Sequence, residues 1–491
     1  MKRKQSLKIV FSAFMAFFFS LIFYAFNTPL GPSIGSDNAM YLTMGTALAR
    51  GYAPYTQIFD HKGPILFLLQ LLPQIFSGGY STFMIFLQEV VFLFLCLRLV
   101  SHIARETGLP EFPMEILYLA MNCSLAGGGN LTEEYTALPT LCSILLIFRT
   151  FCLRTAPDKQ EEGLFSRAVA MGSFAMLIFL VRANNALPIG FMAVGLAIFL
   201  LISRRFRALK SCATGFLLGM LIVLLPICIW LFSRGSLSAA WYGAIIHNFM
   251  YSSAPGGSRL HALLHEGYGR TALLFLLLSC TGVVFCLRKH YFALVPAILL
   301  GAAGGFLAAF ISRKFYDHYL MIAVPLALTG VCLFLAILPV KMQKAAICLC
   351  LFISSGWLAI KGRETYNWRI SERVDLPAFV QDACSLYEQV PEMERDRFMA
   401  YRVEPRWYVV TQALPCIRFY FLQETLAEAN PVIMDEIVDT FQTKPPLWLV
   451  IYYNRTFSPP YDQRMAEIFA SDYEFVAAAG QYQLLRKKEK Y

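Results

Sequence analysis

The chain has 491 residues, of which 57% are hydrophobic and only 15% are charged, and its mean hydropathy is +0.54. This composition excludes a soluble globular protein and indicates a polytopic membrane protein. The net charge of +10 is uneven: residues 1–360 carry 26 basic and 13 acidic side chains, whereas residues 361–491 carry 16 and 19. Because cytoplasmic loops of membrane proteins are rich in Lys and Arg, no nucleic-acid partner is expected.

The 13 cysteines form no C-x-x-C pair, and 11 of them lie in or beside apolar segments, where Cys behaves as a small apolar residue. Metal binding by cysteine is therefore not expected. Cys384 and Cys416 lie outside these segments and could pair if that part of the chain is exported, which the sequence leaves open.

The first apolar segment, residues 8–26, matches the roughly 20 residues that a helix needs to cross a bilayer. Lys2, Arg3 and Lys4 precede it and predict a cytoplasmic N-terminus. A cleaved signal peptide is the alternative. However, no small-residue cleavage site follows and many apolar segments come later, so we expect an uncleaved first helix.

Residues 27–80 are expected to form the first external loop. Ser36 and Asp37 can cap a helix over residues 38–50, with one apolar face, which Gly51 is placed to end. A second, apolar helix can begin at Pro64, and Pro73 should interrupt it before it reaches residue 76. The loop therefore predicts two helices lying at the membrane interface.

Ten further apolar segments are predicted to span the membrane. They cover residues 81–99, 115–129, 137–151, 169–181, 188–202, 212–232, 271–287, 292–311, 319–338 and 345–360. With the first helix they make eleven, and the basic clusters between them all fall on the N-terminal side. An odd count places the tail outside. One kinked helix around Arg182 is an alternative, but it would misplace every later basic cluster, so we expect two.

From residue 361 the composition becomes that of a soluble domain. Helices are predicted over residues 376–389 and 432–441, a buried strand over 447–453, and a terminal hairpin over 473–485. The predicted fold is thus a helical membrane domain over residues 1–360, followed by a small extracytoplasmic α/β domain over residues 361–491. The second domain has no nucleotide fingerprint or catalytic triad, so its expected role is structural or in acceptor recognition.

The predicted external face of the membrane domain carries few carboxylates and several cations. The carboxylates are Asp37, Asp60, Glu133, Glu134, Glu266 and Asp317; the cations are Lys62, Arg182, Arg234, Arg259, Arg270, Arg313 and Lys314, with His61, His247, His261, His265 and His318 as titratable neighbours. Such a set suits a reaction on an anionic lipid, in which a base deprotonates an acceptor hydroxyl and cations stabilise a departing phosphate.

Asp37 comes shortly after the first span and is followed by Tyr41, Ala47, Gly51 and the pair Pro54-Tyr55. This pattern resembles the first-loop signature of the GT-C superfamily of glycosyltransferases that use polyprenyl-phosphate sugars, which includes the protein O-mannosyltransferases and the lipid A aminoarabinose transferases. The resemblance continues at residues 60–64, at residues 129–134 and at residues 315–319, which run into Pro325. The order and sidedness of these motifs extend it over most of the membrane domain.

The resemblance implies that Asp37 is the general base. It also implies that Asp60 and one of Glu133 and Glu134 orient the acceptor or hold a divalent cation. Because the donor leaves as a stable phosphate anion, the reaction needs positive charge more than an acid. The candidates for holding the phosphate are Lys62, Arg182, Arg313, Lys314 and His318. A single base opposite the leaving group implies inversion at the anomeric carbon.

Each candidate also has a structural interpretation. Asp37 could merely cap a helix, Asp60 could pair with Lys62 in a turn, and Glu133 and Glu134 could favour a helix N-terminus. Cations at the end of a span can extend to the interface, which applies to Arg313, Lys314 and His318. The histidines at 247, 261 and 265 lack metal-ligand spacing and are expected to be solvated or packed in a loop. Glu89, inside a span, needs a partner that the sequence does not identify.

The predicted function is that of a glycosyltransferase of the plasma (inner) membrane. It would move a sugar from a polyprenyl-phosphate carrier to a lipid, polysaccharide or protein acceptor on the extracytoplasmic side. The alternatives are a flippase for a lipid-linked saccharide, a polysaccharide ligase or polymerase with a diphosphate-linked donor, and a scaffold acting through the tail. The absence of a sequence repeat and the odd number of spans argue against a transporter.

Overall fold

The computed structural model describes residues 2–24, 26–29, 34–151, 163–253, 257–421, 423–453 and 461–489. The chain divides into two compact units, each built from separate stretches of sequence. Unit 1 comprises Met1–Thr28, Phe86–Ile229 and Pro255–Tyr366, and unit 2 comprises Pro29–Ile85, Trp230–Ala254 and Asn367–Tyr491.

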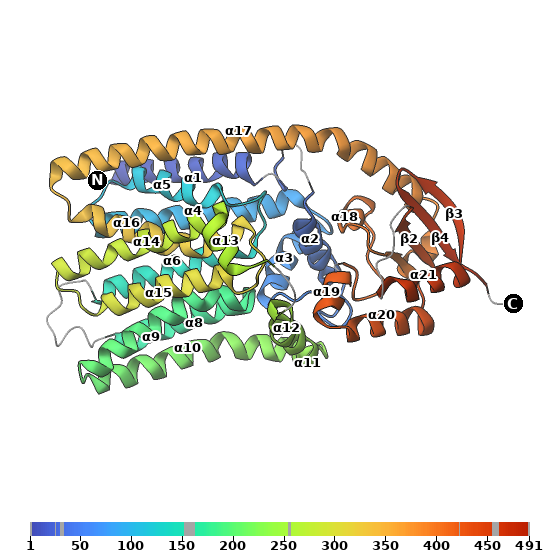
Figure 1. Ribbon diagram of the computed structural model, residues 1–491, viewed down its shortest axis with the longest axis horizontal. Coiled ribbons are helices and arrows are strands. Elements are labelled where there is room, and N and C mark those ends of the chain that lie inside the picture. Colours follow the sequence, from blue (N-terminus) through green and yellow to red (C-terminus); the bar gives the residue numbers. More distant parts are fainter. Residues whose placement is uncertain are drawn as a thin grey trace. The chain divides into compact units, whose positions relative to one another are not determined.

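Unit 1 is helical, and its long helices lie side by side (Figure 1). They are α1 (Lys2–Phe23), most of α4 (Thr82–Glu106), α5 (Glu111–Cys123), α6 (Thr132–Phe151), α8 (Leu164–Val181), α9 (Leu187–Ile202), most of α10 (Phe206–Ser233), α13 (Arg259–His265), α14 (Gly267–Arg288), α15 (Leu294–Phe310), α16 (Val324–Ala336) and the first part of α17 (Val340–Tyr387). Two 3-10 helices, η1 (Ala183–Ala186) and η3 (Asp317–Ala323), lead directly into α9 and α16.

Each of the eleven segments predicted to span the membrane contains a helix. Among the described residues, eight helical segments are long and apolar enough to cross a bilayer. The other three predicted spans correspond to α5, α6 and α15, which fall short of that length or hydropathy. The chain is therefore a polytopic, mainly helical membrane protein.

The helix around Arg182 is broken, as predicted. Arg182 has an extended backbone (φ −160°, ψ 119°) between the end of α8 and η1. Leu164 at the beginning of α8 and Leu200 near the end of α9 line the same cavity, so the two helices run in opposite directions. They are two separate helices, not one kinked helix.

Glycines bring α8 and α10 into close contact. A Cβ atom added at Gly172 would overlap the carbonyl oxygen of Phe216, and one at Gly219 would overlap that of Val169. Small residues at such crossings let helix backbones approach each other in a membrane, where packing rather than the hydrophobic effect drives association.

Unit 2 combines short helices with a four-stranded sheet. Its helices are α2 (Ser36–Ala49), α3 (Pro64–Ser77), α11 (Leu237–Trp241), the π-helix η2 (Tyr242–Ile246), α12 (His247–Ser253), the 3-10 helix η4 (Glu392–Arg397), α18 (Arg406–Thr411), α19 (Gln423–Ala429), α20 (Val432–Thr443), α21 (Tyr461–Asp472) and the end of α17. The strands are β1 (Phe398–Ala400), β2 (Trp448–Tyr452), β3 (Tyr473–Ala479) and β4 (Tyr482–Lys487), in the order β1-β2-β4-β3.

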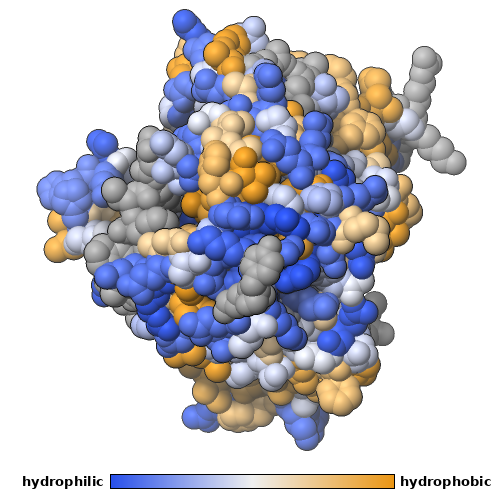
Figure 2. Space-filling view, turned by 90° about the vertical axis from the view of Figure 1, so that its right-hand side faces the viewer, coloured by the Kyte–Doolittle hydropathy of each residue, from blue (hydrophilic) through white to orange (hydrophobic). Residues whose placement is uncertain are grey.

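Three of the four elements predicted for the tail are confirmed, whereas the helix predicted over residues 376–389 is not separate but the end of α17. Helix α20 and strand β2 lie where expected, and β3 and β4 form an antiparallel hairpin that turns at Gly480, whose φ of 53° suits glycine. Strand β1 is the exception to the antiparallel pattern, since it runs parallel to β2. Figure 2 views the side on which this sheet is drawn in Figure 1 and shows a largely hydrophilic surface. Cys384 and Cys416 are both free.

The first-loop helices differ from the predicted interfacial pair in two ways. Gly35 is the N-cap of α2 and no side chain caps it, so the predicted capping by Ser36 and Asp37 is wrong. Residues 38–48 are all buried, which leaves α2 without the solvated face of an interfacial helix. Its end is confirmed, because Gly51 has a φ of 90°.

Helix α3 begins at Pro64, as predicted, but it continues through Pro73 to Ser77 without interruption. It packs closely against α2: a Cβ atom at Gly45 would overlap the backbone of Gln70. Helix α2 therefore lies in the interior of unit 2, whereas α3 exposes Leu72, Ile75 and Phe76 on its other face.

Candidate functional site

In unit 2, three consecutive side chains form a buried polar turn just before α3. The Asp60 Oδ1 atom accepts a hydrogen bond of 2.7 Å from the backbone N–H of Lys62 and lies 3.8 Å from the Lys62 Nζ atom. That Nζ atom is 3.0 Å from the His61 Nε2 atom. An ammonium group can only donate, so His61 accepts here and carries any ring proton on Nδ1, which lies 3.8 Å from Asp60. The structural alternative for Asp60, a local interaction with Lys62 in a turn, is therefore present.

The backbone of this turn is held from several elements. The hydroxyl of the fully buried Tyr55 donates to the Lys62 carbonyl at 2.7 Å, and Asn248 of α12 donates its Nδ2–H to the His61 carbonyl at 2.6 Å. The N–H of Phe59 donates to the Arg418 carbonyl at 3.0 Å. The Lys62 ammonium is thus presented by a turn with little freedom to move.

His247, which the sequence analysis expected to be solvated or packed in a loop, joins this cluster. It is packed and fully buried, but it lies at the start of α12 and not in a loop. Its ring centroid lies 6.0 Å from those of both His61 and Phe59, and its two nitrogens have no hydrogen-bond partner among the described residues. Burial and then the charge of Lys62 lower its pKa to about 4, so His247 is neutral at pH 7.

The only structural signal for His247 is the π-helix η2 that ends directly before it, since π-turns inside helices are frequent at functional sites. No sequence spacing marks a π-turn. By contrast, His261 and His265 are exposed, as expected, and His261 lies 3.4 Å from the partly exposed Glu266.

Asp37 lies in the first turn of α2 and is half-buried. Its carboxylate makes no hydrogen bond or ion pair with any residue in the described ranges. The helix N-terminus favours its negative charge. An ionised carboxylate that no neighbour occupies can accept a proton from a ligand.

In unit 1, Glu133 and Arg182 form a buried ion pair. The Arg182 Nη1 atom lies 2.6 Å from the Glu133 Oε1 atom, and their side chains are 12% and 1% exposed. Thr132 donates its hydroxyl to the other Glu133 oxygen at 2.8 Å. The Arg182 guanidinium also stacks on the Tyr319 ring, 4.3 Å from its centroid. Glu133 is therefore a fixed partner of Arg182.

His318 is attached to the same group of residues. Its ring packs edge-on against Tyr319 with centroids 4.6 Å apart, and it stacks on Tyr316 at 5.6 Å. The structure thus brings Glu133, Arg182 and His318 together through Tyr319, although they are far apart in the sequence.

Glu134 behaves differently from its neighbour. It is buried, and neither of its carboxylate oxygens has a hydrogen-bond partner among the described residues. Glu89, for which no partner could be named, accepts hydrogen bonds from the backbone N–H of Asn130 and, at 3.3 Å, from Asn27. Glu89 thereby holds the Gly129-Asn130 bend that precedes α6.

Arg313 and Lys314 lie between α15 and η3 and are half-buried. Neither side chain forms an ion pair within the described part of the chain. Arg313 has a φ of 54°, which is unusual for a residue with a side chain and marks a tight turn. These two cations are available to an anionic ligand.

The described residues contain no group of three or more His, Cys, Asp or Glu side chains arranged to hold a metal ion. Asp60 and Glu133, two of the carboxylates expected to share in holding one, are each engaged by a local cation. No step below depends on a metal.

Comparisons with known proteins show the fold. No protein-family model matches the sequence, and no curated protein sequence matches it significantly. Among solved structures, ArnT from Cupriavidus metallidurans bound to undecaprenyl phosphate is similar over 99% of this chain and 98% of its own, with a TM-score of 0.63 and 16% identity.

Two structures of an archaeal protein are similar as well. The Archaeoglobus fulgidus oligosaccharyltransferase in complex with Zn and sulfate covers 94% of this chain and 71% of its own, with a TM-score of 0.55 and 11% identity. The same organism's AglB with an inhibitory peptide and a dolichol-phosphate covers 91% and 70%, with a TM-score of 0.51 and 11% identity. The expected fold, a polytopic helical membrane protein with a small C-terminal sheet, is confirmed, and it is the fold of these structures.

Proposed function

We propose that this chain, which has the fold of ArnT and AglB, is an integral membrane glycosyltransferase that uses a polyprenyl-phosphate-linked sugar as its donor. The acceptor is a lipid, polysaccharide or protein hydroxyl on the extracytoplasmic side, and the charge pattern of the loops orients the N-terminus to the cytoplasm and the tail away from it. The observation that carries the proposal is the carboxylate of Asp37 at the start of α2, which no described residue engages, in a fold that matches ArnT from end to end.

In this proposal Asp37 removes the proton of the acceptor hydroxyl. The oxygen attacks the anomeric carbon of the donor sugar, a new glycosidic bond forms, and the bond from that carbon to the phosphate oxygen breaks. The carrier leaves as polyprenyl phosphate, which is stable as an anion and needs no general acid. Attack from the face opposite the leaving group inverts the anomeric configuration.

Each unit, taken by itself, contains candidate cations for contacting the phosphate. In unit 2 this is Lys62, whose turn is fixed by Tyr55 and Asn248. In unit 1, Arg313 and Lys314 are the stronger candidates because they have no competing carboxylate among the described residues. Arg182 and His318 support that role, but Arg182 already neutralises Glu133.

The carboxylates Asp60, Glu133 and Glu134 keep the proposed role of orienting the acceptor or holding a divalent cation. The three carboxylates differ in whether described residues already bind their oxygens. Glu134 has both oxygens free of hydrogen bonds from described residues, whereas Asp60 and Glu133 bind local partners. Glu134 is therefore the one of the three carboxylates that no described side chain engages.

The test incubates purified protein in nanodiscs with a panel of radiolabelled polyprenyl-phosphate sugars and membrane extract, and measures label in the acceptor fraction. Asp37→Asn should reduce transfer by about 10²–10⁴-fold, the usual contribution of a general base. Glu266→Gln is the matched control, because the Glu266 side chain is 42% exposed and its carboxylate has only His261 as a partner among the described residues.

Transfer by D37N at the wild-type rate would remove Asp37 from the role of base. Donor movement across the bilayer without any label transfer would instead identify a flippase. Transfer that needs a diphosphate-linked donor would identify a ligase or polymerase.

A further inference from the structure

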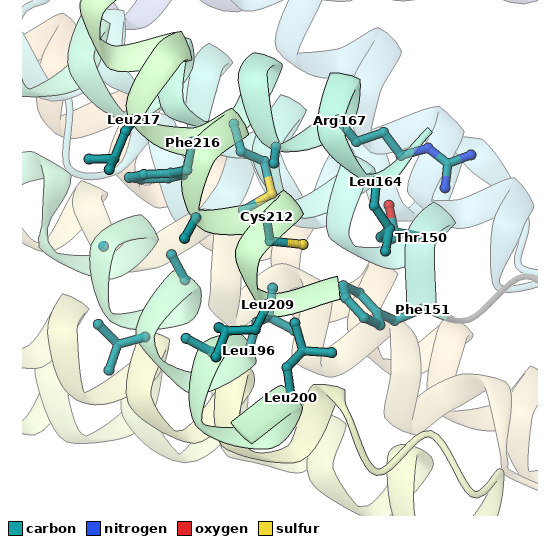
Figure 3. A pocket seen from close by; sticks show the side chains of 17 residues that line it. Thr150, Phe151, Leu164, Arg167, Leu196, Leu200, Leu209, Cys212, Phe216 and Leu217 are labelled. Atoms are coloured by element: carbon teal, nitrogen blue, oxygen red, sulfur yellow. The ribbon is translucent and has the colours of Figure 1, made fainter. Parts of the chain in front are cut away.

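Unit 1 contains an apolar cavity of about 360 Å³ between α6, α8, α9 and α10. Its wall is made almost wholly of aliphatic and aromatic side chains, among them Leu164, Leu196, Leu200 and Phe216. Figure 3 shows these side chains around the hollow, with the guanidinium of Arg167 at its edge pointing away from the apolar wall. The cavity therefore has an apolar interior and a cationic side chain at its edge.

The cavity lies at the end of the helices opposite to the Arg182–Glu133 pair. It is lined by the last residues of α6, the first turns of α8, residues 190–200 of α9 and the first half of α10. Glu133 begins α6 and Arg182 follows the end of α8, so the ion pair lies at the opposite ends of these two helices from the cavity. The cavity is thus a different site from the one discussed above.

Positive charge gathers at this end of the helices. Arg167 lines the cavity, and Arg205, which directly precedes α10, donates its backbone N–H to the carbonyl oxygen of Leu200 in the cavity wall at 2.9 Å. Arg204, Arg207 and Lys210 lie in the same short stretch of sequence. Such clusters mark the cytoplasmic side of a membrane, where anionic lipid headgroups are concentrated.

We propose that this cavity binds one acyl chain of an anionic glycerophospholipid of the cytoplasmic leaflet, whose phosphate contacts Arg167 and Arg205. The chain fills a space that offers almost no hydrogen-bonding group, and the headgroup meets the cations at its margin. A zwitterionic lipid could place the same acyl chain in the cavity, but its headgroup would gain less binding energy from these cations. The bound lipid would also join α8, α9 and α10 where no side chain of the described residues fills the gap between them.

The test is native mass spectrometry of the full-length purified protein, titrated with phosphatidylglycerol and, separately, with phosphatidylcholine of the same acyl chains. The wild type should hold one phosphatidylglycerol at least 10-fold more tightly than phosphatidylcholine. Ala197→Trp, which fills the cavity, should weaken that binding at least 10-fold. Ile222→Trp, on the exposed side of α10, is the matched control and should leave it unchanged.

Arg167→Gln should bring the affinity for phosphatidylglycerol close to that for phosphatidylcholine, whereas Arg288→Gln, an exposed arginine at the end of α14, should not. R167Q alters a half-buried side chain at the margin, so it keeps the test decisive if A197W does not fold. Equal affinities for the two lipids in the wild type would overturn the proposal. So would unchanged binding in a folded A197W, or stronger binding of undecaprenyl phosphate, which would make the carrier the occupant.

Discussion

Removing one member of the Glu133–Arg182 pair should destabilise the protein strongly. The two groups are 2.6 Å apart and their side chains are 1% and 12% exposed, so Glu133→Gln leaves a buried guanidinium without its counter-charge. Breaking a buried pair in this way costs about 3–5 kcal/mol. With an unfolding entropy of about 2.1 cal/mol/K per residue, the free energy of unfolding of this chain changes by about 1 kcal/mol per degree near the melting temperature. The melting temperature should therefore fall by about 3–5 °C.

The assay is thermal unfolding in one detergent, followed by intrinsic fluorescence. Glu106→Gln is the matched control, because Glu106 pairs with Arg149 at 3.0 Å in the same unit but with side chains 32% and 40% exposed. An exposed pair contributes about 0–1 kcal/mol, so this variant should melt within about 1 °C of the wild type. Arg182→Lys should be intermediate, since it keeps the charge but loses the planar stacking on Tyr319. If E133Q and E106Q melt at the same temperature, the Glu133–Arg182 pair does not support the fold.

Three further variants address the other features. Because the pKa of His247 is lowered to about 4, the unfolded chain binds a proton before the folded one as the pH falls from 6.5 to 4, and up to about 3 kcal/mol of stability is lost over that range. His247→Phe should flatten this part of the pH–melting curve, whereas the exposed His265→Gln should not; an equally steep curve in H247F would contradict the assignment. Tyr55→Phe removes the buried hydrogen bond to the Lys62 carbonyl and should lower the free energy of unfolding by about 1–3 kcal/mol in the same melting assay. An unchanged melting temperature would mean that another donor replaces this bond. Gly219→Val should force α8 and α10 apart and reduce the yield of monodisperse protein in size-exclusion chromatography, whereas Gly356→Val meets open space; equal yields would argue against a close helix crossing.

Much of the fold could be predicted from hydropathy and charge, because a bilayer requires long apolar helices and biases the loops that flank them. The eleven helical segments, the break at Arg182 and the terminal hairpin follow from these local properties. The capping of α2 could not be predicted in the same way. Gly35 takes the N-cap position, and the packing of α2 against α3 at Gly45 buries the face that an isolated helix would expose.

The candidate residues were found from their chemistry and order in the chain, but their partners depend on tertiary contacts. Glu133 and Glu134 are neighbours of one type, and only the fold gives one of them an arginine while the other has no hydrogen bond from a described residue. His247 resembles the exposed His261 in the sequence, and burial against Phe59 and His61 alone distinguishes it. Periodicity and composition depend on neighbouring residues, whereas an ion pair between residues 49 positions apart depends on how helices pack. The sequence therefore determined which side chains are present and which segments are helical, and the tertiary structure decided which of those side chains remain free to act.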